Sequence, residues 1–138
     1  MTIETGFEIP PWDMPSVSPD RMKTMAAILR DPYPVHWDPR VVEQIGLGKR
    51  TINQGPLGLS YMINMLHDWT GIGSIKRLRM TFPLPVFQDD HIIARGQVTE
   101  VRVEDGKTVA DCDIWLDRDG EDKPLVGTAT VSLDELSA

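Results

Sequence analysis

An aspartate and a histidine stand five positions apart in a segment rich in proline. Asp31 and His36 belong to the stretch DPYPVHWD, residues 31–38, and Pro39 follows it. Proline fixes the backbone φ angle, so this stretch predicts a rigid loop, and such loops often present catalytic groups. Histidine exchanges protons near neutral pH, which suits general acid–base chemistry. The alternative is that His36 caps a helix or bonds a backbone carbonyl, and the spacing alone favours this alternative.

A second candidate is Gly55, between Gln54 and Pro56 at the start of an apolar segment. Free backbone N–H groups at a helix N-terminus form a site for negative charge. Pro56 has no N–H, so the Gly55 N–H is the candidate to hold an oxyanion. Taken by itself, Gly55 is better explained as a residue that turns the chain.

Three cations, Lys76, Arg77 and Arg79, are concentrated in an otherwise acidic chain and could meet phosphate groups. A charged strand face that only contacts solvent is the alternative. His67 is expected to be structural and His91 to be solvated. No group of residues has metal-ligand spacing, so no metal is expected.

The bulk properties restrict the class of protein. The 138 residues predict one domain, residues 1–138, with residues 1–17 as an N-terminal extension. The net charge of −7 argues against nucleic acid as a partner, because that binding depends on cationic side chains. A single cysteine, no signal peptide and no long apolar run predict a soluble, cytoplasmic protein without a membrane span.

Helices are expected in the first half of the chain and strands in the second, which predicts an α+β fold. Ser18 and Asp38, each followed by proline, predict helices over residues 19–30 and 39–45. Residues 56–70 predict a third helix, apolar over most of its circumference and therefore buried. Alternating apolar residues predict antiparallel strands over residues 92–98, 107–117 and 125–133, with a further strand over 73–82.

Three of these segments together resemble one family. Residues 31–38 resemble the D-x-N-P-(I/V/L)-H-x-D signature of MaoC-like (R)-specific enoyl-CoA hydratases. Residues 53–60 are similar to the start of that family's central helix, and residues 73–90 to the following strand and its F-x-x-P-V-x-x-G-D turn. The stretches RDPYPVHWD and HDWTG also resemble the small subunits of actinobacterial steroid side-chain hydratases, which pair with a second MaoC-like chain. Two departures are Tyr33, where the signature usually has asparagine, and Gln54, where the family often has histidine.

The resemblance implies a single hot-dog fold, in which a curled antiparallel sheet wraps one long central helix. It implies reversible hydration of a trans-2-enoyl-CoA, with the coenzyme A thioester as substrate and no other cofactor. Asp31 and His36 would hold and activate water, and the Gly55 N–H would meet the thioester oxygen. Substrate contacts would come from Tyr33, Gln54, Lys76, Arg77 and Arg79.

The resemblance also implies a homodimer or a heteromer with a related hot-dog chain. Two other functions stay open: an acyl-CoA thioesterase, and a non-catalytic subunit of a heteromeric hydratase. The sequence does not decide the acyl group, which could be short, long or a steroid side chain. It also leaves open which member of the Asp31–His36 pair is the acid, because coupled groups titrate together.

Overall fold

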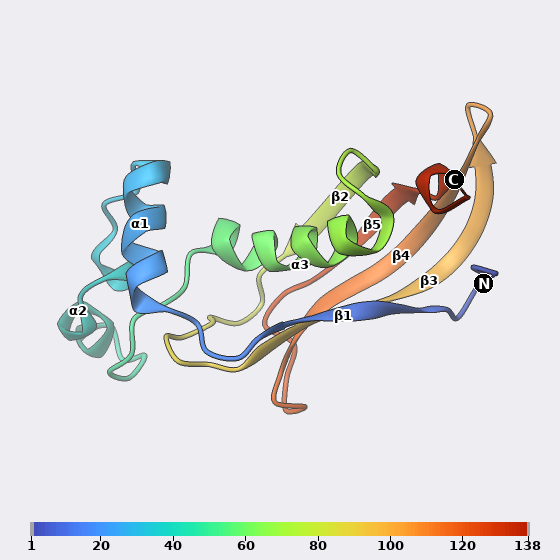
Figure 1. Ribbon diagram of the computed structural model, residues 1–138. Helices are drawn as coiled ribbons and strands as arrows, with labels where there is room; N and C mark the ends of the chain where they lie inside the picture. Colours follow the sequence, from blue (N-terminus) through green and yellow to red (C-terminus); the bar gives the residue numbers. More distant parts are fainter. Residues whose placement is uncertain (1, 138) are drawn as a thin grey trace.

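A computed structural model describes residues 2–137 and shows one antiparallel sheet packed against one long helix (Figure 1). The strands lie in the order β1-β3-β4-β5-β2. Their bounds are β1 Glu8–Met14, β2 Ile75–Thr81, β3 Ile92–Glu104, β4 Lys107–Arg118 and β5 Val126–Ser132. The helices are α1 Pro19–Leu29, α2 Pro39–Gln44 and α3 Gly55–Thr70, with short 3-10 turns η1 Pro34–His36 and η2 Asp134–Ser137.

The first two helices begin at the predicted caps. The Ser18 hydroxyl accepts a hydrogen bond from the Arg21 N–H at 3.3 Å, and the Asp38 carboxylate accepts one from the Arg40 N–H at 3.0 Å. Each bond satisfies a backbone donor that the first helical turn cannot pair. Helix α1 ends at Arg30, whose left-handed φ of 52° turns the chain into the proline-rich stretch. The caps therefore fix both ends of the loop that begins at Asp31.

Helix α3 is the predicted long helix, and its apolar side packs on the sheet. The side chains buried there include those of Leu57, Tyr61, Met62, Met65, Leu66 and Trp69. Burying one such side chain contributes about 1.5–3 kcal/mol. The opposite side carries the exposed residues Asn64 and Asp68, so the sheet covers one side of α3 and not its full circumference.

Strands β3 and β4 form a long hairpin, with pairs that run from Ile92↔Arg118 to Glu104↔Lys107. The turn residues Asp105 and Gly106 have φ angles of 51° and 76°. Two consecutive positive φ angles match the right-handed twist of the strands in a two-residue turn. Aspartate followed by glycine is therefore the expected pair at this position.

The N-terminal segment differs from its prediction, because β1 pairs with β3 at the edge of the sheet. Ile9, Met14 and Val17 are buried in or beside the core. Pro10 and Pro11 fall where the register shifts between Ile9 and Trp12, a place that tolerates missing N–H donors. Residues 8–14 thus form a strand of the sheet, where an N-terminal extension was expected.

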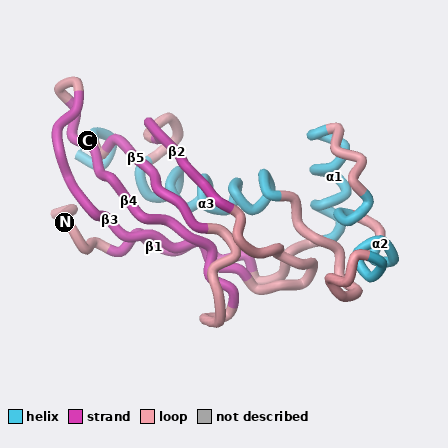
Figure 2. The backbone as a smooth tube through the Cα atoms, turned by 180° about the vertical axis from the view of Figure 1, so that it is seen from behind, coloured by secondary structure: helices cyan, strands magenta, loops and turns pink. Residues whose placement is uncertain are grey.

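Helices α1 and α2 lie beyond the first turn of α3, away from the body of the sheet (Figures 1 and 2). Turn η1 lies between them in the sequence. Its residue Val35 is buried, and the Val35 carbonyl accepts a hydrogen bond from the Ile52 N–H at 2.8 Å. This bond brings the loop of residues 31–38 beside residues 52–55, which lead into α3.

Candidate active site

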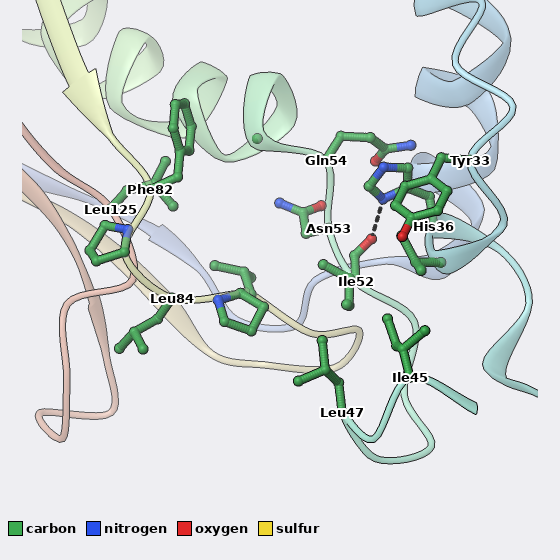
Figure 3. A pocket seen from close by; sticks show the side chains of 15 residues that line it. Tyr33, His36, Ile45, Leu47, Ile52, Asn53, Gln54, Phe82, Leu84 and Leu125 are labelled. Carbon is green, nitrogen blue, oxygen red and sulfur yellow. Dashed lines mark hydrogen bonds between the residues drawn. The ribbon is translucent and has the colours of Figure 1, made fainter. Parts of the chain in front are cut away.

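His36 and Asp31 lie side by side in the structure. The His36 Nδ1 atom is 2.7 Å from the Ile52 carbonyl oxygen (Figure 3). A carbonyl oxygen only accepts, so Nδ1 carries the hydrogen, and in the neutral ring Nε2 is the free acceptor. Nε2 lies 3.4 Å from Asp31 Oδ2. The ring is therefore oriented with its basic nitrogen toward the carboxylate.

Asp31 is held by one hydrogen bond of its backbone and one of its side chain. Its N–H donates to the Ala26 carbonyl at 2.9 Å, and its Oδ1 atom accepts from the Tyr33 N–H at 3.1 Å. The Asp31 side chain is 38% exposed, whereas that of His36 is 11% exposed. One carboxylate oxygen is thus used to fix the loop, and the other faces histidine and solvent.

A cavity of about 390 Å³ opens beside His36. Its wall is mostly apolar and comes from three parts of the chain (Figure 3). The first part contributes Tyr33, Val35, Ile45, Leu47 and Ile52, the second Phe82, Pro83, Leu84, Pro85 and Val86, and the third Leu125. The polar contributors are His36, Asn53, Gln54 and Gly55. An apolar cavity with a few polar groups is typical of a small-molecule site.

Gly55 is the first residue of α3 and lines this cavity. Within residues 2–137 its N–H donates to no carbonyl or side chain, whereas the N–H groups of Leu57 and Gly58 both turn back to the Gln54 carbonyl. A Cβ atom at Gly55 would lie 3.1 Å from Phe82 Cε1. Glycine therefore keeps Phe82 in place and leaves one free donor at the positive end of the helix dipole.

Two consecutive amides, Asn53 and Gln54, precede Gly55 and are 6% and 1% exposed. The Gln54 Nε2 atom donates to the Met22 carbonyl at 2.7 Å, but Gln54 Oε1 has no partner among the described residues. Neither Asn53 Nδ2 nor Asn53 Oδ1 has a partner there. Gln54 was predicted from the sequence and Asn53 was not, because the only signal for Asn53 is a pair of amides beside apolar residues.

The predicted substrate-binding cations do not lie in this cavity. Lys76, Arg77 and Arg79 are exposed on the edge strand β2, and Arg77 pairs with Glu104 at 2.8 Å. Tyr33, also predicted, lines the cavity and meets the His36 ring edge-on, with 6.0 Å between ring centroids. Contact of the three cations with coenzyme phosphates stays a prediction.

Asp90 supports one wall of the cavity, a role that was not predicted from the sequence. It is buried, and its carboxylate accepts from Arg50 at 2.8 Å, from Arg118 at 3.0 Å and from the Phe87 N–H at 2.9 Å. Arg118 also donates to the Pro85 carbonyl at 2.8 Å. These bonds tie the loop of residues 83–90 to strand β4 and to the segment before α3.

Residues 2–137 bring together no group of three or more His, Cys, Asp or Glu side chains able to hold a metal ion. No helix in the same range is long and apolar enough to cross a membrane.

Comparisons with solved structures show proteins of the same fold. The (R)-hydratase from A. caviae involved in PHA biosynthesis superposes with a TM-score of 0.83 at 24% identity, over 96% of this chain and 98% of that one. The ChsH1–ChsH2 complex from Mycobacterium tuberculosis gives 0.78 at 21% identity, over 96% and 98%. The HadBC (3R)-hydroxyacyl-ACP dehydratase complex of the same organism gives 0.75 at 15%, over 95% and 98%.

These likenesses show the hot-dog fold, with one long helix on an antiparallel sheet, as predicted. No curated protein sequence matches the chain. The sequence pattern described as "MaoC like domain" matches residues 3–113, which is most of the chain and includes Asp31, His36 and Gly55. The chain therefore belongs to the MaoC-like family of hot-dog hydratases and dehydratases.

Proposed function

We propose that this protein hydrates trans-2-enoyl-CoA thioesters reversibly, with Asp31 and His36 acting on water and the Gly55 N–H on the thioester oxygen. The observation that carries the proposal is the orientation of His36. Its Nδ1–H bond to Ile52 directs the basic Nε2 atom toward Asp31, at a cavity that also contains the free Gly55 donor.

Hydration adds the water oxygen to C3 of the thioester and a proton to C2. His36 Nε2 and Asp31 Oδ2, 3.4 Å apart, would both contact one water molecule from the cavity side, and the pair would take one proton from it and deliver one to C2. Such acid–base catalysis contributes roughly 10²–10⁴-fold. Attack at C3 moves negative charge to the thioester oxygen, where a donor such as the Gly55 N–H is worth about 10²–10³-fold.

Two alternatives fit the site less well. A thioesterase with its carboxylate on the central helix is disfavoured, because the only acid of α3 is Asp68, which is exposed near its far end. A purely structural subunit would not need a histidine oriented toward a carboxylate beside an apolar cavity. An acyl-CoA hydratase would use the oriented histidine, the carboxylate and the apolar cavity together.

We also propose that a second hot-dog chain, identical or related, covers the open side of the cavity. Five side chains at its rim, Tyr33, Ile45, Leu47, Phe82 and Leu84, are 41–53% exposed. Apolar groups gathered at one place on a surface mark interaction sites. The ChsH1–ChsH2 and HadBC structures are complexes, which supports a partner of the same fold.

The test is hydration of crotonyl-CoA, followed as loss of the enoyl absorbance. The expected result is turnover by the wild type and a rate lower by about 10²–10⁴-fold in His36→Ala. His67→Ala is the matched control, because His67 lies near the other end of α3 and outside the cavity lining. Equal rates for wild type and His36→Ala would contradict the proposal. If the purified chain is folded but inactive, adding a related hot-dog chain tests the proposed partner.

A further inference from the structure

Asn53 is the polar residue of the cavity whose role the proposed mechanism leaves unexplained. Both polar atoms of its carboxamide are buried without a hydrogen-bond partner among residues 2–137. Its backbone is held, since the Asn53 N–H donates to the Val86 carbonyl at 2.7 Å. The Asn53 side chain lies at the cavity wall (Figure 3), and neither of its polar atoms is paired there.

Tyr61 is the polar side chain of α3 that lies close to Asn53. Burial raises the pKa of the Tyr61 hydroxyl, and a long side-chain contact of hydrogen-bond type with Asn53 lowers it. The two groups nonetheless do not meet hydrogen-bond geometry. Tyr61 instead stacks on Trp12, with ring centroids 5.6 Å apart. A structural bond between Asn53 and Tyr61 is thus the alternative that a test must separate.

Leaving a buried donor and acceptor unpaired is costly, and such groups are rare in native proteins. An apolar residue of the same size would remove the cost. A ligand that supplies the missing partner would also remove it, and Asn53 lines a cavity that is large enough for one.

We propose that Asn53 contacts the substrate directly and, through Nδ2, donates a hydrogen bond to the oxygen-bearing end of an acyl thioester. This inference rests on the proposed function. The apolar tail of the acyl group would leave the carboxamide unpaired, whereas the thioester carbonyl or the 3-oxygen satisfies it. Gln54 Oε1, the neighbouring unpaired acceptor, suits a donor such as water or the 3-hydroxyl. Asn53 thereby selects which end of the acyl group lies next to His36.

The test compares Asn53→Leu, which keeps the shape of the side chain, with Asn64→Leu. Asn64 is the other asparagine of this region and is exposed on α3. For crotonyl-CoA hydration, kcat/KM is expected to fall about 10- to 100-fold in Asn53→Leu, from the loss of one buried hydrogen bond. Asn64→Leu is expected to match the wild type. The Tm of Asn53→Leu is expected to equal or exceed that of the wild type, because two unpaired polar atoms are gone.

Tyr61→Phe completes the design, because it removes only the hydroxyl. If Asn53→Leu and Tyr61→Phe both lower the Tm, Asn53 has a structural partner in Tyr61 and the inference is wrong. It is also wrong if the wild type hydrates crotonyl-CoA and Asn53→Leu does so equally well, which leaves the hydratase proposal intact.

Binding of butyryl-CoA, a saturated thioester that cannot be hydrated, separates the two proposals. A wild type that binds butyryl-CoA but hydrates no enoyl thioester contradicts the hydratase proposal. Weaker binding by Asn53→Leu would then still support the contact with the thioester. A wild type that neither binds nor hydrates thioesters overturns both.

Discussion

Asp31→Asn and His36→Ala, made singly and together, test whether the two side chains act on one water molecule. Each single variant removes one member of a pair whose atoms lie 3.4 Å apart. Each is expected to lose about 10²–10⁴-fold in kcat, the usual contribution of a general acid or base. Because residues that act as a unit are not additive, the double variant should be no slower than the slower single variant.

The structure also predicts what each variant does to stability. His36→Ala leaves the Ile52 carbonyl without its partner, which costs about 1–3 kcal/mol. For a chain of this length that lowers the Tm by roughly 3–15 °C. Asp31→Asn keeps an oxygen for the Tyr33 N–H and should lower the Tm less. All variants should therefore be folded in an assay at 25 °C.

The assay is crotonyl-CoA hydration at saturating substrate, with thermal unfolding measured on the same samples. Asp68→Asn and His67→Ala provide a matched control pair, since they are adjacent near the far end of α3. If the loss in the double variant equals the product of the two single losses, the two groups act independently and do not share one water molecule. A single variant that keeps more than a tenth of the wild-type rate would also contradict this shared role.

Three further predictions concern the body of the domain. Gly96→Ala is expected to lower the free energy of unfolding by about 1–3 kcal/mol, because the new Cβ atom would lie 2.7 Å from Ile9 Cδ1. An unchanged midpoint of urea unfolding would contradict this expectation. Burial raises the pKa of the Cys112 thiol to about 12, so a disulfide reagent at pH 8 should label it only after unfolding, and rapid labelling of the native protein would show the burial to be wrong. The hydrogen bond to Asp13 raises the pKa of His91 above 6.5. The pair therefore stabilises the fold fully below pH 6.5, and this stabilisation is lost as the pH rises through the pKa that His91 has in the folded protein. Tm measured against pH should therefore fall more steeply over that range in the wild type than in Asp13→Asn, and parallel curves would count against the pair.

The parts of the fold that depend on residues close together in the sequence were predictable. Ser18 and Asp38 cap their helices through bonds to residues two or three positions away. The turn at Asp105 and Gly106 depends on the conformations of those residues alone. Strand β1 was missed because Pro10 and Pro11 weaken the alternating pattern, and only the register shift against β3 accommodates them.

The candidate site was predictable only in part, for a similar reason. Asp31 and His36 are close in sequence, so a short rigid loop brings them together. Asp90 meets Arg50 across 40 positions and Arg118 across 28, and no local pattern encodes such pairs. The unpaired state of Asn53 is likewise a property of packing, because it depends on which groups fail to reach the side chain.

The two edge strands have a consequence for how the protein behaves at high concentration. An exposed edge offers unpaired N–H and C=O groups to any other extended chain, and this is a common route to aggregation. Strand β1 carries Pro10 and Pro11, which cannot donate, and strand β2 carries the exposed charges of Lys76, Arg77 and Arg79. Both features oppose the addition of a foreign strand. Replacing the three cations by apolar residues would therefore be expected to yield fibrils or precipitate during expression, whatever its effect on catalysis.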